Sequence, residues 1–111
     1  MRTIGPVQLY KATVSSGTVT TNILDTRFMT DTAFLISTPG GSSLVASVKA
    51  FVSFDNINYY DSGMIFPAIA SGANNIPVEG PGGFPYVELQ ITRSAGSGVL
   101  TVTGYAKGVA R

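Results

Sequence analysis

The stretch from Ser53 to Gly63 concentrates polar chemistry in a chain that has little of it elsewhere. Its sequence, S-F-D-N-I-N-Y-Y-D-S-G, holds two carboxylates, two amides and two tyrosines. Carboxylate and amide oxygens are ligands that suit Ca²⁺, and tyrosine rings can stack on a sugar whose hydroxyls bond to nearby amides. The candidate glycan contacts are Asp55, Asn58, Tyr59, Tyr60 and Asp61.

The alternative is that these side chains only build a turn between two strands. An EF-hand-like loop needs oxygen donors at alternate positions and a central glycine, whereas here Ile57 follows Asn56. Asp and Asn side chains also bond their own backbone in Asx turns, and tryptophan, the strongest stacking platform, is absent. Strand alternation would direct one of the two tyrosines inward. We therefore expect a turn at Asp55 and Asn56 and one outward tyrosine, with glycan and calcium binding as alternatives.

Catalytic chemistry has few other residues to use. The chain has no histidine and no cysteine, which removes the commonest general base, disulfides and thiolate metal sites, and most nucleophilic triads. A carboxylate pair for glycoside hydrolysis would have to come from Asp25, Asp31, Asp55, Asp61, Glu79 and Glu88. Six scattered acids in a small domain are more typical of loops and caps, so we expect no enzyme, no metal and no cofactor.

The composition limits the partners. Seven cations and six acids make up 12% of 111 residues, with a net charge of +1, against a usual charged fraction of about 25%. There is no run of Lys or Arg to mark a nucleic-acid-binding surface. The longest apolar run, Met64 to Ala70, is far shorter than the roughly 18 residues of a membrane span, and no apolar segment follows Arg2 to indicate a signal peptide. An uncharged surface favours contacts between proteins in a symmetric homo-oligomer.

Alternation of apolar and polar residues predicts the strands. Every second residue from Leu44 to Phe54 is apolar, which indicates a half-buried strand with Phe54 as its last inward residue. The runs 86–93 and 99–106 alternate in the same way, and the S-A-G-S-G between them predicts an antiparallel hairpin. Short edge strands are expected at 64–68 and 75–78, because the prolines in them cannot donate to a central ladder.

Weaker strands are expected at 7–14, 19–24 and 33–37, and no stretch repeats apolar residues at helical spacing. About eight strands at intervals of 8 to 12 residues are typical of a sandwich. The sequence predicts an all-β fold: one antiparallel β-sandwich of jelly-roll type without significant helix. Residues 1–111 form a single domain in this prediction, with 1–6 as a candidate N-terminal arm.

Three stretches together resemble small virion proteins of tailed bacteriophages. V-S-S-G-T-V-T-T-N-I-L-D-T-R, followed by F-L-I-S-T-P-G, is similar to their Ser- and Thr-rich opening strand that ends in Leu-Asp. V-K-A-F-V-S-F-D-N-I-N-Y-Y-D is similar to a motif in which a strand ends in Ser, any residue, Asp, Gly and an aromatic, with Asn56 here in place of the glycine. F-P-Y-V-E-L-Q-I-T-R-S-A-G-S-G-V-L-T-V-T-G-Y looks like their closing hairpin.

The resemblance covers most of the chain, and it implies a β-sandwich that serves as capsid decoration or cement, as a neck or tail component, or on a fibre. It implies no active site. We expect a virion component, made in the bacterial cytoplasm, that decorates the capsid and contacts other copies of itself and the major capsid protein. A neck or tail adaptor and a virion-borne carbohydrate-binding module are the alternatives.

The expected contact surface is made of uncharged loops and the N-terminal arm, because such segments are costly to leave in water. Its residues are Arg2, Pro6, Pro39, Gly40, Ile65, Phe66, Phe84 and Pro85.

Overall fold

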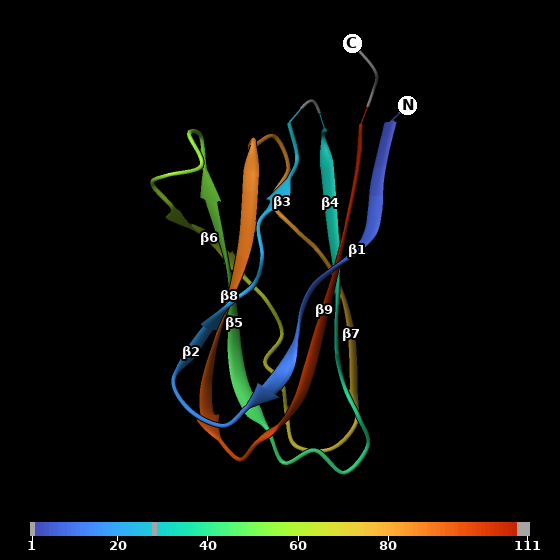
Figure 1. The fold of residues 1–111 in the computed structure, drawn as a ribbon, viewed down its shortest axis with the longest axis vertical. Coiled ribbons are helices and arrows are strands. Elements are labelled where there is room, and N and C mark those ends of the chain that lie inside the picture. Colours follow the sequence, from blue (N-terminus) through green and yellow to red (C-terminus); the bar gives the residue numbers. More distant parts are fainter. Residues whose placement is uncertain (1, 28, 109–111) are drawn as a thin grey trace.

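The computed structural model describes residues 2–27 and 29–108, which fold into two antiparallel β-sheets packed face to face (Figure 1). The strands are β1 (Arg2–Val14), β2 (Thr18–Thr20), β3 (Leu24–Asp25), β4 (Asp31–Thr38), β5 (Val45–Ser53), β6 (Tyr60–Ile65), β7 (Asn74–Glu79), β8 (Tyr86–Ala95) and β9 (Gly98–Gly108). One sheet has the order β1-β9-β4-β7, and the other has the order β2-β8-β5-β6, with β3 also pairing with β8. None of these residues forms a helix long and apolar enough to cross a membrane.

The strand order is that of a jelly roll. The chain changes sheet at the connections from β1 to β2, from β3 to β4, from β4 to β5, and at each connection from β6 to β9. Both β2 and β3 pair with β8, so they act as one interrupted strand, which brings the arrangement to the eight strands of two Greek keys. The expected fold class is confirmed, and the run expected at 19–24 is divided between these two short strands.

The predicted hairpin between the last two long strands is wrong. β8 pairs with β5 and β2, whereas β9 pairs with β1 and β4 in the other sheet. The loop between them crosses from sheet to sheet and is attached to the β4–β5 connection, where the Ser97 N–H donates to Ser43 Oγ at 3.0 Å and the Ser43 N–H donates to the Ser97 carbonyl at 3.2 Å. Alternation gives both strands an inward face, but it cannot distinguish strands that pair from strands that face each other across a core.

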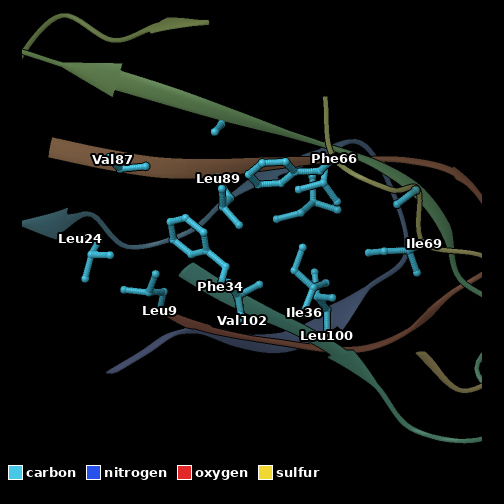
Figure 2. Close-up of a cluster of buried hydrophobic side chains, with 14 of the residues drawn as sticks. Leu9, Leu24, Phe34, Ile36, Phe66, Ile69, Val87, Leu89, Leu100 and Val102 are labelled. Carbon is cyan, nitrogen blue, oxygen red and sulfur yellow. The ribbon is translucent and has the colours of Figure 1, made fainter. Parts of the chain in front are cut away.

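The core lies between the sheets and comes from the alternating residues that the sequence indicates. In β5 and just before it, Leu44, Ala46, Val48, Ala50 and Val52 are all buried, as predicted. Side chains from both sheets meet in one apolar layer (Figure 2), among them Leu9, Leu24, Phe34, Ile36, Phe66, Ile69, Val87, Leu89, Leu100 and Val102.

The edge strand expected at 75–78 is confirmed: β7 ends the first sheet, and Pro77 pairs with Leu35 from this edge position. The edge strand expected at 64–68 is displaced, because β6 ends the second sheet but spans Tyr60–Ile65 and stops before Pro67. Residues 2–6, indicated as a candidate arm, belong to β1, where Arg2 to Ile4 pair with Gly108 to Ala106. Met1 lies outside the described residues.

Candidate functional site

The β5–β6 connection is organised around the hydroxyl of Ser53. This side chain is fully buried, although its place in the alternation predicted an outward position. Its Oγ accepts hydrogen bonds from the N–H groups of Asp55 (3.2 Å) and Asn56 (2.9 Å), and it donates to Asp55 Oδ1 at 3.0 Å. Burial follows because this oxygen satisfies backbone donors that the end of β5 leaves unpaired.

The Asp55 carboxylate completes the turn. Oδ1 accepts from the N–H groups of Ile57 and Asn58, both at 2.9 Å, and Oδ2 accepts from Asn58 Nδ2 at 2.9 Å. The backbone bonds from Asn58 and Ile57 hold the pKa of Asp55 well below its ordinary value. A lowered carboxyl pKa stabilises the folded loop at every pH above the ordinary value, and this stabilisation disappears only in strong acid.

Asn56 supplies the backbone reversal, with a φ of 61°, in the left-handed region that Asn and Gly tolerate. Its Oδ1 accepts from the Tyr59 hydroxyl at 2.6 Å. Asp55 and Asn56 therefore form the expected turn, and both carboxylate oxygens of Asp55 bind groups of the loop itself.

Neither tyrosine enters the core, so the expected inward tyrosine is a wrong prediction. Tyr59 is half-buried on the outside of the second sheet, where burial raises its pKa and the nearby Glu88 carboxylate raises it further. Glu88, whose alternation with Val87 and Leu89 predicts the face opposite the core, is itself buried, and burial raises its pKa. Tyr60 begins the edge strand β6 and is exposed. Alternation does not direct these residues because one precedes the strand and the other opens it at a free edge.

The position of Phe54 is a further correction in this region, because it was expected as the last inward residue of the strand. Its ring is 69% exposed, and Ile57 at the crest of the turn is 79% exposed. The Phe54 ring packs edge-on against Phe84 of the β7–β8 connection, with 5.7 Å between ring centroids. We call the exposed side chains of Phe54, Ile57 and Tyr60 the apolar tip. Sequence reasoning missed the tip because the buried Ser53 ends the alternation one residue early, although an isoleucine inside a polar turn was a usable signal.

The residues expected at a contact surface do not form one patch. Pro39 and Gly40 lie exposed in the β4–β5 connection, at the opposite end of the sandwich from the β5–β6 and β7–β8 connections (Figure 1). Phe66 is buried against Phe34, with 6.4 Å between ring centroids, so its expected surface role is wrong: β6 ends at Ile65, and the next side chain enters the core. Of the remaining expected residues, Pro6 and Ile65 are exposed, and Phe84 and Pro85 are half-buried beside the tip. The backbone of Arg2 pairs with Gly108 in the first sheet.

The six acids are dispersed. Asp25 binds Arg27, with 2.7 Å between the charged atoms, and Asp61 lies 3.6 Å from the Lys49 ammonium. Asp31 and Glu79 line one shallow hollow of about 320 Å³ with Lys107, but both are exposed, whereas the general acid in glycoside hydrolysis lies in a hydrophobic pocket. Within residues 2–27 and 29–108, no three acidic side chains gather as a metal site would require.

Comparison with known proteins finds likeness in the fold only. No family model matches the chain, and no curated protein matches it. A chain in a structure of infectious bursal disease virus, Gt strain, aligns with a TM-score of 0.50 and 11% identity, over 96% of this chain and 31% of that one. The Gx strain gives a TM-score of 0.47 and 15% identity, over 95% and 30%. This chain thus spans under a third of the length of those viral chains.

Proposed function

We propose that this chain is a non-enzymatic structural protein of a virus particle, and that it decorates the capsid surface by contacts with other proteins. The observation that carries the proposal is the apolar tip, where Phe54, Ile57 and Tyr60 expose large side chains. The jelly roll is a fold that viral shells use widely. The fold likeness to chains from a virus and the sequence resemblance to tailed-phage virion proteins favour the same role.

The loop beneath the tip would lower the cost of such a contact. Ser53 and Asp55 hold the turn through hydrogen bonds to its own backbone, and the Phe84 ring supports Phe54 from the side. A side chain that is already ordered loses little conformational entropy on binding. Burial of apolar area contributes roughly 25 cal/mol per Å², and a symmetric shell multiplies each modest contact.

Particle binding tests the proposal. Purified particles of the virus that encodes the chain are expected to contain it, and particles assembled without it should rebind the purified protein. The double variant F54S/I57S should bind at least ten times more weakly, because two exposed apolar anchors account for a large part of a small interface. Cosedimentation with particles measures both.

The matched control is Ile23→Ser, which removes an exposed apolar side chain that lies between β2 and β3 and is not part of the tip. It should bind like the wild type. Absence of the chain from particles that hold all other virion proteins would refute the role, and equal losses in the control and the double variant would exclude the tip.

The second candidate function is glycan recognition, favoured by Tyr60 and Asp61, which are both exposed on the edge strand β6. Under this alternative, Tyr60→Ala should abolish retention on a glycan array, because a stacked aromatic platform is removed. Tyr59→Ala should also weaken retention, partly through loss of its bond to Asn56. If the chain only decorates the capsid, the wild type should retain no glycan on the array. Circular dichroism checks that the two tyrosine variants are folded.

A further inference from the structure

The outward face of the sheet β1-β9-β4-β7 is apolar at its centre. The register places Ala33 beside Tyr105 and Leu35 beside both Thr103 and Pro77. Leu35 is 42% exposed there, although it sits in the middle of a four-stranded sheet. Together with Pro6, these side chains line an open hollow of about 450 Å³. We call the outward side chains of these four strands the outer face.

Charge on the outer face is confined to its margins. Asp31 and Lys107 are register neighbours at one end of β4 and β9. Glu79 lies on the edge strand β7 and Lys11 on the edge strand β1. Between these margins, the outward residues that pair across β4 and β9 are all uncharged, including Ser37 beside Thr101. Such a face resembles the core and rim of a protein interface. We call each set of paired residues across the four strands a row.

We propose that the outer face binds a second copy of this chain about a two-fold axis that runs along the strands, between β4 and β9. This operation keeps each residue at its height along the strands and exchanges β4 of one copy with β9 of the other. It follows from the register that Lys107 of each copy lies opposite Asp31 of the second copy. The interface is isologous, as in most soluble dimers.

The same operation matches large side chains with small ones. Tyr105 of one copy lies opposite Ala33 of the other, and Leu35 lies opposite Thr103. The same argument applies to the outer strands β1 and β7. Lys11 of β1 and Asn75 of β7 lie at the same height, because Lys11 pairs with Thr101, Thr101 with Ser37, and Ser37 with Asn75. Lys11 of one copy therefore faces the uncharged amide of Asn75 in the second copy. The row of Glu79 ends at the Gly5–Pro6 segment of β1, which is also uncharged. No like charges oppose each other in these rows.

The size of the outer face sets the expected affinity. Four strands about 4.8 Å apart and eight residues long cover about 500 Å² in projection. Stable interfaces bury roughly 800 Å² per partner, so we expect a dimer that dissociates on dilution, with a dissociation constant on the order of micromolar. This inference rests on the proposed role in a virus particle and deepens it, since it names one surface through which copies of the chain would contact each other.

The proposal is tested by reversing the charge of Asp31 in one variant and of Lys107 in another, and by then mixing the two variants. Sedimentation velocity should show the wild type as a concentration-dependent dimer. D31K alone and K107D alone should each dissociate at least tenfold more readily, because each homodimer now opposes like charges. An equimolar mixture should recover the dimer, since a copy with two lysines then faces a copy with two aspartates. The proposal is overturned if the wild type stays monomeric at millimolar concentration, or if the mixture matches its separate components.

A second variant avoids any effect of charge reversal on the fold. Leu35→Asp leaves both margin charges in place and should abolish the dimer, whereas Ser47→Asp, on the outward face of the other sheet, should not. Thermal unfolding confirms that each variant is folded, and a dimer that survives L35D refutes this face. If L35D is monomeric but still binds particles, the capsid role stands without the dimer. If the wild type dimerises but never binds particles, the dimer proposal stands and the proposed capsid role is refuted.

Discussion

Replacing Gly96 with alanine is expected to lower the free energy of unfolding by roughly 2–4 kcal/mol. Gly96 has a φ of 66°, in the left-handed region, and a Cβ there would lie 1.8 Å from the Ser43 carbonyl oxygen. This oxygen is backbone and cannot rotate away, so the β8–β9 loop would have to leave the β4–β5 connection. Urea unfolding measures the loss, and Tm should fall by about 10 °C.

Gly17→Ala is the matched control for backbone conformation. Its φ is 65°, but nothing lies within 4 Å of the position of a Cβ. Only the conformational cost of about 1 kcal/mol then applies. Equal losses in the two variants would contradict the close approach of the β8–β9 loop to Ser43.

The second large effect is expected at Ile69. Its side chain is 0% exposed and fills the core between the sheets (Figure 2), while its backbone exchanges hydrogen bonds of 2.8 and 3.0 Å with Ala46. Ile69→Ala should lower the free energy of unfolding by about 2–5 kcal/mol, because the substitution leaves a cavity that the sheets cannot close. Chemical denaturation with an unchanged m-value would confirm a loss of stability alone.

The control for this substitution is Ile65→Ala, four positions earlier in the chain. Ile65 is 93% exposed, so its loss should change the free energy of unfolding by less than about 0.5 kcal/mol. Similar effects at the two isoleucines would show that the inward position of Ile69 is wrong.

Much of the fold can be predicted because alternation is a local property. The buried residues of β5 follow from residue spacing, as does the lack of helix within residues 2–27 and 29–108, and the edge position of β7 follows from Pro77. The errors occur where a strand ends. Ser53 was placed outside and Phe54 inside, but the hydroxyl of Ser53 satisfies the turn, and this places Phe54 at the surface. Alternation predicts burial only while the ladder continues.

The sequence by itself determined an all-β chain with a continuous apolar layer, a turn at Asp55 and Asn56, and a surface poor in charge. These features depend on neighbouring residues and on composition. Only the tertiary structure decided that β8 and β9 face each other across the core, that Phe66 is buried, and that Leu35, Tyr105 and Pro77 share one outer face. Strand pairing joins residues that are distant in the chain, and many pairings satisfy the same alternation, so the packing of the whole chain selects among them.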